Sequence, residues 1–115
     1  MKTLVCGSRA AVDPKPLYEF LDKLQPRPTL IISGTARGAD IFGEIWARNN
    51  KIPCKRFPAD WRKYGKSAGF RRNLEMLDEA ERVVAYWDGR SSGTRHTISE
   101  GSKRGLQVEI VDVAG

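Results

Sequence analysis

Three glycine-containing segments of this chain carry side chains suited to binding an anion, and each directly follows a stretch that is predicted to be a strand. The first segment is Gly7-Ser8-Arg9. A glycine lets the backbone approach a ligand, a serine supplies a hydroxyl, and an arginine forms a two-pronged pair with phosphate. Taken by itself, this segment is more typical of a plain turn with an exposed arginine.

The second segment, Gly34-Thr35-Ala36-Arg37-Gly38-Ala39-Asp40, joins a predicted strand to a helix. Free amides and the positive end of the helix dipole favour an anion at such a junction. The segment matches neither the G-x-G-x-x-G fingerprint nor a Walker loop, so those mechanisms do not transfer to it. Asp40 has two interpretations: it accepts a hydrogen bond from a ribose hydroxyl, or it complements the helix N-terminus, which its spacing favours.

The third segment, Asp88-Gly89-Arg90-Ser91-Ser92-Gly93-Thr94, also leads from a predicted strand into a helix. Its small residues can wrap a phosphate with backbone amides, and Thr94 adds a hydroxyl at the helix start. A tight solvent-exposed loop is the alternative. Because ligands of open parallel sheets bind outside the carboxyl ends of the strands, we expect the three loops to converge on one site.

A fourth group of candidates lies between the second and third segments. Trp61 follows Asp60 in the run Pro58-Ala59-Asp60-Trp61 and can stack on a base, while Arg72 and Asn73 can face the same crevice. The alternative places Trp61 against the edge of the domain and Arg72 in solvent. The single histidine, His96, has no nucleophile or acid at a telling spacing, so we expect a surface residue and no nucleophilic triad.

The elements that must position these residues alternate along the chain. Short apolar stretches typical of buried strands cover residues 3–6, 29–32, 54–57, 82–87 and 107–113. Apolar residues at helical spacing separate them, after Asp13-Pro14, around Trp46, around Leu74 and over residues 94–103. Residues 58–67 read as a long polar connection. This alternation predicts a Rossmann-like, doubly wound, mostly parallel sheet of five strands with helices on both faces, built as one domain over residues 1–115.

The composition favours an anionic partner. The formal net charge is +6, and residues 55–72 hold seven basic side chains against one acid, Asp60. A solvated basic face is the alternative. Cys6 and Cys54 are isolated in predicted strands, which indicates buried free thiols rather than a disulfide or metal site. No membrane-spanning stretch or signal peptide is apparent, so we expect a cytoplasmic protein without a membrane partner.

The motifs together resemble the YspA-like branch of the SLOG superfamily, over nearly the whole chain. The resemblance is carried by Val5-Cys6-Gly7-Ser8-Arg9, residues 33–40, Pro58-Ala59-Asp60-Trp61, Gly69, Arg72-Asn73, Met76 and Gly93-Thr94. SLOG domains are Rossmann-like and include the LOG phosphoribohydrolases, the DNA-binding DprA proteins and sensors of nucleotide-derived signals in bacterial and phage conflict systems. The resemblance implies ligand binding by Gly7, Ser8, Arg9, Gly34, Arg37, Gly38, Asp40, Gly93 and Thr94.

The resemblance does not supply a catalytic group. LOG enzymes carry a P-G-G-x-G-T-x-x-E element, whereas the corresponding stretch here is 88–97, with Thr97 in the place of the glutamate and no proline. Glu100 lies one turn further along the predicted helix. We therefore expect a binding module for a nucleotide or nucleotide-derived small molecule, with no cofactor or metal, acting as a homo-oligomer.

Two alternatives belong to other classes. One is a phosphoribohydrolase that acts on nucleoside monophosphates, in which Asp40, Asp60 or Glu100 stabilises a developing oxocarbenium charge. The other, ranked last, is nucleic-acid binding through residues 55–72, whose affinity would fall steeply with salt.

Overall fold

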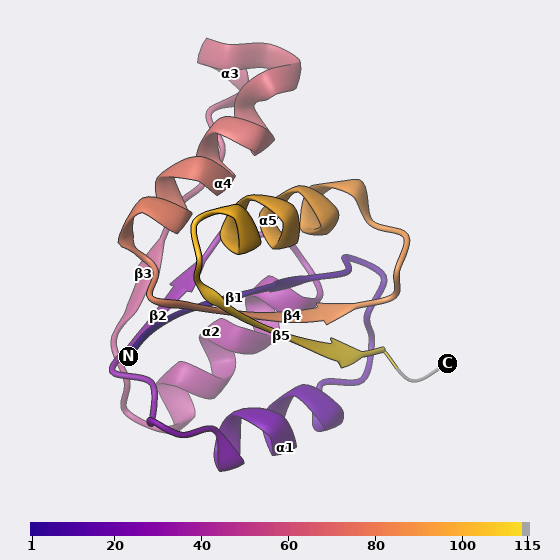
Figure 1. Cartoon of the computed structure of the whole chain (residues 1–115). Coiled ribbons are helices and arrows are strands. Elements are labelled where there is room, and N and C mark those ends of the chain that lie inside the picture. The colour runs from indigo at the N-terminus through magenta and orange to yellow at the C-terminus, as the bar shows by residue number, and fades with distance from the viewer. Residues whose placement is uncertain (114–115) are drawn as a thin grey trace.

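The structure, a computed structural model, describes residues 1–113, and residues 114 and 115 of the expected domain lie outside this range. Strands and helices alternate along the chain (Figure 1). The strands are β1 (Lys2–Gly7), β2 (Leu30–Ser33), β3 (Cys54–Arg56), β4 (Arg82–Trp87) and β5 (Gln107–Asp112). The helices are α1 (Lys15–Lys23), α2 (Ala39–Asn49), α3 (Trp61–Tyr64), the 3-10 turn η1 (Gly65–Ser67), α4 (Ala68–Glu79) and α5 (Ser92–Lys103).

The strands form one parallel sheet in the order β3-β2-β1-β4-β5. Leu4 of β1 pairs with Ile32 of β2 on one side and with Val83 of β4 on the other. The chain builds outward from β1 in one direction and then returns to add β4 and β5 on the opposite side. This reversal places the switch point, where ligands of such sheets bind, between β1 and β4. The predicted Rossmann-like fold is confirmed.

Both faces of the sheet are covered. Helices α1 and α2 lie on one face and α4 and α5 on the other (Figure 1). Val5 packs in the first core with Leu17 and Trp46, whereas its neighbour Leu4 packs in the second with Met76. Strands buried on two faces need apolar residues at successive positions, which is why they read as continuous apolar runs.

The chain departs from the sequence-based expectations around α3 and α5. The expected polar connection at 58–67 contains α3 and η1, which are too short to show a helical period. Helix α5 begins at Ser92, two residues before the predicted start, because the carbonyl oxygen of Ser91 accepts the N–H of Arg95 and closes the first turn.

The predicted burial of two side chains was wrong. Cys6 is buried, but Cys54 is exposed because β3 is a three-residue strand at the edge of the sheet. His96 is half-buried rather than a surface residue, since its ring lies 4.4 Å from that of Phe70. No helix within residues 1–113 has the length and apolar character to cross a membrane.

Candidate functional site

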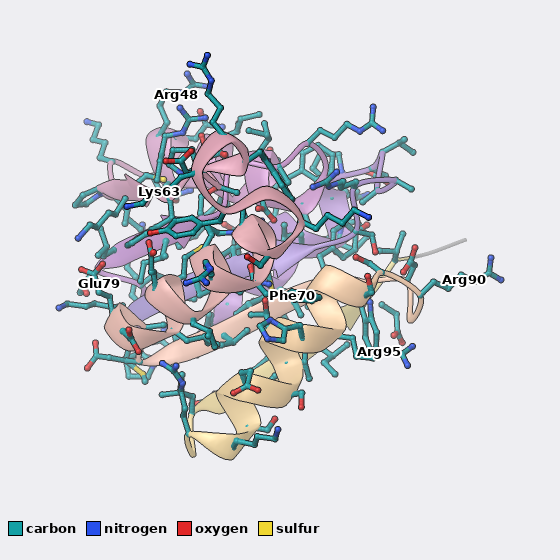
Figure 2. All side chains as sticks on the ribbon, turned by 90° about the horizontal axis from the view of Figure 1, so that it is seen from above. Arg48, Lys63, Phe70, Glu79, Arg90 and Arg95 are labelled. Atoms are coloured by element: carbon teal, nitrogen blue, oxygen red, sulfur yellow. The ribbon has the colours of Figure 1, made fainter. Side chains whose placement is uncertain are left out.

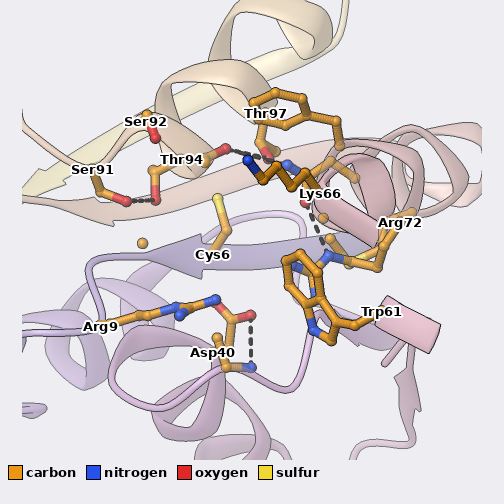
Figure 3. Close-up of a pocket in the computed structure, with 17 residues that line it drawn as sticks. Cys6, Arg9, Asp40, Trp61, Lys66, Arg72, Ser91, Ser92, Thr94 and Thr97 are labelled. Carbon is orange, nitrogen blue, oxygen red and sulfur yellow. Dashed lines mark hydrogen bonds between the residues drawn. The ribbon is translucent and has the colours of Figure 1, made fainter. Parts of the chain in front are cut away.

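A cavity of about 450 Å³ opens at the carboxyl ends of β1 and β4, at the switch point of the sheet. Figure 3 shows residues of four chain segments converging on it. The lining residues are Cys6, Gly7 and Arg9 at and after the end of β1, Ala36 and Asp40 after β2, Trp61, Lys66, Gly69, Phe70, Arg72, Asn73 and Met76 of α3, η1 and α4, Ser91 just before α5, and Ser92, Gly93, Thr94 and Thr97 of α5. The volume lies within the usual range for small-molecule sites, roughly 300–1,000 Å³.

Ser8 joins the three glycine loops. Its side chain is buried, and its Oγ accepts a hydrogen bond of 2.9 Å from the backbone N–H of Asp88 after β4. Its carbonyl oxygen accepts one of 3.3 Å from the N–H of Ala39 after β2. The loops after β1, β2 and β4 therefore meet at one rim of the sheet, with Ser8 as the structural link between them.

Two glycines permit this close approach. Gly7 has φ 151°, and a methyl group there would lie 1.9 Å from the carbonyl oxygen of Tyr86. Gly38 has φ 82°, and a methyl group there would lie 2.3 Å from the carbonyl oxygen of Ser8. Only glycine fits at such positions, because both the conformation and the space exclude a Cβ.

The start of α5 forms one wall of the cavity. The carboxylate of Asp88 accepts hydrogen bonds from the N–H groups of Arg90 (2.8 Å) and Ser91 (3.2 Å), which lower the pKa of Asp88 and fix the loop before the helix. The hydroxyls of Ser91 and Thr94 lie 3.2 Å apart. The first amides of a helix have no acceptor within it, so this wall can receive a negatively charged group.

Three amides of the β2–α2 loop, in contrast, are bound by the protein itself. The N–H of Thr35, a residue with the strained φ of 68°, donates to Ser33 Oγ at 3.1 Å. The N–H of Ala36 donates to Asp40 Oδ2 at 3.2 Å, and that of Ala39 donates to Ser8. The main contribution of this loop to the cavity is therefore the side chain of Asp40, not a set of free amides.

Asp40 and Arg72 form the polar floor of the cavity. Burial raises the pKa of Asp40 to about 6, against the lowering effects of the Ala36 N–H and the Arg72 charge. The Arg72 guanidinium donates to the carbonyl oxygen of Gly34 and to Asn73 Oδ1. Burial, followed by the Asp40 charge, raises the pKa of the Cys6 thiol, so this thiol lines the cavity in its neutral form.

Asn73 connects this floor to the α5 wall. Its side-chain amide accepts from Arg72 and lies 3.3 Å from both the carbonyl oxygen of Gly93 and Nδ1 of His96. Asn73 is 5% exposed, and because it contacts both Arg72 and α5 it positions groups of the site as well as lining the cavity. The network holds Arg72 and the start of α5 in a fixed relation.

The outer rim is aromatic and cationic. Trp61 is 52% exposed and Phe70 is 48% exposed, although both line the cavity. In Figure 3 Lys66 lies beside Trp61, on the wall opposite Arg9. A planar ring and a negatively charged group can both be accommodated between these walls.

The structure brings only some of the sequence-predicted site residues to the cavity. Those that line it are Gly7, Arg9, Asp40, Trp61, Arg72, Asn73, Ser91, Gly93 and Thr94. Those outside the lining are Ser8, Gly34, Thr35, Arg37, Gly38, Asp60, Asp88 and Gly89. Ser8, Gly34 and Gly38 of this second group contact or allow the close approach of segments that line the cavity. The carboxylate of Asp60 accepts a hydrogen bond from the N–H of Lys63 and caps α3. Arg37 is exposed.

Other lining residues were not assigned to the site from the sequence. They are Cys6, Ala36, Lys66, Gly69, Phe70, Met76, Ser92 and Thr97. Phe70 and Met76 share a helical apolar pattern with core residues, so the pattern alone could not separate rim from core. Thr97, at the place of the LOG glutamate, donates its hydroxyl to the carbonyl oxygen of Gly93 at 3.2 Å. Glu100 lies outside the lining and pairs with Lys103.

The fold and the site define a Rossmann-like domain with a ligand cavity at its switch point. The chain belongs to the YspA, cpYpsA-related SLOG family, whose family model matches residues 1–64. It is 35% identical to the Gene 61 protein of Mycobacterium phage D29 over 116 residues, which covers 93% of each chain. The predicted membership of this branch of the SLOG superfamily is confirmed.

A solved structure shares the fold. DNA processing protein A (DprA) from Streptococcus pneumoniae superposes with a TM-score of 0.78 over 95% of this chain at 19% sequence identity. The match covers 49% of the DprA chain, so this chain spans about half of that protein. The comparison supports the Rossmann-like architecture.

Proposed function

We propose that this chain binds a nucleotide or a nucleotide-derived small molecule in the cavity at the carboxyl ends of β1 and β4. The observation that carries the proposal is the composition of this one cavity. Three cationic side chains, the first turn of α5 and an exposed tryptophan line it, whereas Asp40 is the single carboxyl in the lining. Phosphate and an aromatic base are the two chemical groups that such a lining complements.

The walls suggest an orientation for the ligand. The phosphate lies at the start of α5, where Ser91 and Thr94 offer hydroxyls and Arg9 faces them across the cavity (Figure 3). The base lies against Trp61 at the outer rim. Asp40 and Arg72 then face the sugar from the floor, where a carboxyl with a pKa of about 6 can accept or donate a hydrogen bond.

Calorimetric titration tests this proposal. The panel contains nucleoside mono-, di- and triphosphates, cyclic nucleotides and ADP-ribose derivatives. We expect Arg9→Ala to weaken binding about 10- to 150-fold, the loss of one charged hydrogen-bonding group, roughly 1.5–3 kcal/mol. Arg48→Ala is the matched control, because Arg48 is exposed near the far end of α2 (Figure 2). Arg37→Ala asks whether an arginine outside the lining contributes.

The proposal is wrong if no member of the panel binds wild-type protein, or if Arg9→Ala and Arg48→Ala bind as wild type does. Light scattering with and without the bound nucleotide tests the accompanying expectation of a homo-oligomer.

A second candidate function is hydrolysis of the N-glycosidic bond of a nucleoside monophosphate. It is favoured by Asp40, whose buried carboxyl lies in the cavity with a raised pKa, as an acid or base near neutral pH requires. Chromatographic detection of free base from a panel of monophosphates tests it. Release of base by wild type and its loss in Asp40→Asn would support hydrolysis, and base release that survives in Asp40→Asn would exclude this role.

A further inference from the structure

The basic residues between Lys55 and Arg72 divide into two groups in the structure. Lys55 and Arg56 on β3 form ion pairs with Glu79 (2.6 Å) and Glu44 (3.1 Å). Arg72 turns inward onto carbonyl oxygens. Within residues 1–113, no ion pair joins a carboxylate to the remaining members, Arg62, Lys63, Lys66 and Arg71.

These four residues form what we call the cationic ridge. They lie on α3, η1 and the first turns of α4, a segment that projects from the body of the molecule (Figure 1). All four are exposed, and α3 and η1 have no buried residue. Figure 2 shows Lys63 well apart from Arg90 in the loop after β4 and from Arg95 in the first turn of α5. The ridge therefore gathers on one projection four exposed cations without an ion pair to any described residue.

An aromatic ring orders part of the ridge. The Lys63 ammonium lies 5.1 Å and the Arg71 guanidinium 4.5 Å from the centre of the Tyr64 ring. Arg71 also donates to Ser67 Oγ at 3.2 Å. Cations held in this way against a ring lose less freedom on binding an anion than free side chains do.

The ridge is continuous with the cavity. Lys66 belongs to both, and Trp61 on α3 lines the cavity next to it. A ligand that fills the cavity and extends past Trp61 thus meets a second row of positive charges. A mononucleotide would occupy only the cavity, whose lining does not include Arg62, Lys63 or Arg71, so these three cations would make no contact with it.

We infer that the ligand is the end of a single-stranded oligonucleotide, whose terminal nucleotide occupies the cavity and whose following phosphates lie along the cationic ridge. The inference rests on the proposed function, since it uses the same cavity for the terminal nucleotide. A stacking ring beside a row of cations is the arrangement that binds single strands without base-specific contacts. A base in a duplex can enter the cavity only after it is unpaired and unstacked, which weakens the binding of a duplex.

The test compares ligands of increasing length by calorimetry: AMP, pApA and the tetranucleotide (pA)4. We expect the tetranucleotide to bind at least tenfold more tightly than AMP. Its log K should also fall more steeply with log salt than that of AMP, by about 2 in slope for three added phosphates. The triple variant Arg62→Ala/Lys63→Ala/Arg71→Ala should lose this gain and keep AMP affinity within about twofold, which also shows that it folds.

The matched control removes the same charge from exposed residues elsewhere that have no ion pair within the described chain, as Lys2→Ala/Lys23→Ala/Arg48→Ala, and should keep the gain with length. The inference fails if AMP and (pA)4 bind equally, or if the ridge variant keeps the gain, although the proposed function then stands. If no nucleotide of any length binds, both fail. A duplex or a poly-glutamate peptide that binds as tightly as (pA)4 would identify a general polyanion surface and overturn the inference.

Discussion

Asp40 and Arg72 approach a single point beside Gly34. A methyl group on Gly34 would lie 2.8 Å from Oδ2 of Asp40 and 2.9 Å from Nη1 of Arg72. The missing side chain thus leaves the space occupied by a buried carboxylate and a half-buried guanidinium at the floor of the cavity. The pair predicts that Gly34, although it lies outside the lining, affects the site.

Gly34→Ala is expected to reduce nucleotide affinity about tenfold. The added methyl group must displace the guanidinium of Arg72 or the carboxylate of Asp40, and loss of one such positioned charged group is worth about 1.5 kcal/mol or more. Because ends of side chains rather than backbone must move, the loss of unfolding free energy should stay near 1 kcal/mol. Calorimetry and urea unfolding measure the two effects, and unchanged affinity would show that the pair does not position the ligand.

The stability of the protein should depend on pH through Asp40. Burial raises the pKa of this carboxyl to about 6 in the folded protein, above its ordinary value of 3.8, so folding is disfavoured once the group ionises. The unfolding free energy of wild type relative to Asp40→Asn should therefore increase by about 1–2 kcal/mol as the pH falls from 8 to 5. Urea unfolding of both proteins at several pH values measures this difference, and a difference independent of pH, or one of opposite sign, would contradict it.

Trp61→Ala should weaken nucleotide binding without destabilising the fold. Stacking of a base on an aromatic side chain contributes about 1–3 kcal/mol, which corresponds to roughly 5- to 150-fold in affinity. The side chain is 52% exposed, so the unfolding free energy should change by no more than about 0.5 kcal/mol. Trp61→Phe keeps a ring and should retain most of the affinity, and equal binding by all three proteins would remove Trp61 from the site.

Two glycines with left-handed backbone should respond differently to alanine. Gly7→Ala places a methyl group 1.9 Å from the backbone oxygen of Tyr86, whereas Gly89→Ala meets nothing within 4 Å. We expect Gly89→Ala to cost only the conformational strain, about 1–2 kcal/mol, and Gly7→Ala to cost at least about 3 kcal/mol. Urea unfolding measures both, and equal losses would contradict the close contact between β1 and β4 at this rim.

The architecture could be predicted from the sequence because its signals are local and repeated. Leu4 and Val5 both face a core, as strands covered on two sides require, and the helices between strands carry apolar stripes. Cys54 was misjudged because a strand at the edge of a sheet has the same composition as a central one. Helix α3 was missed since four residues are too few for a period.

The site could be predicted only in part, because its groups depend on contacts far apart in the sequence. Ser8 looked like a ligand-binding residue, and its hydroxyl and carbonyl instead bind the N–H groups of Asp88 and Ala39. Lys66 lies in a run of basic residues, and the sequence does not distinguish it from Lys63. In the structure Lys66 lies on η1 and lines the cavity. Which amides remain free is decided by such long-range partners and cannot be seen in the motif.

Because α3 and η1 have no buried residue, the segment that forms the outer rim of the cavity is separate from the segments that stabilise the fold. Insertions, deletions or substitutions in this segment alter the side chains that face a ligand at the outer rim. They leave both hydrophobic cores unchanged. Relatives that share the sheet and the Ser8 junction can therefore diverge in ligand choice at little thermodynamic cost, by exchanging one projecting segment.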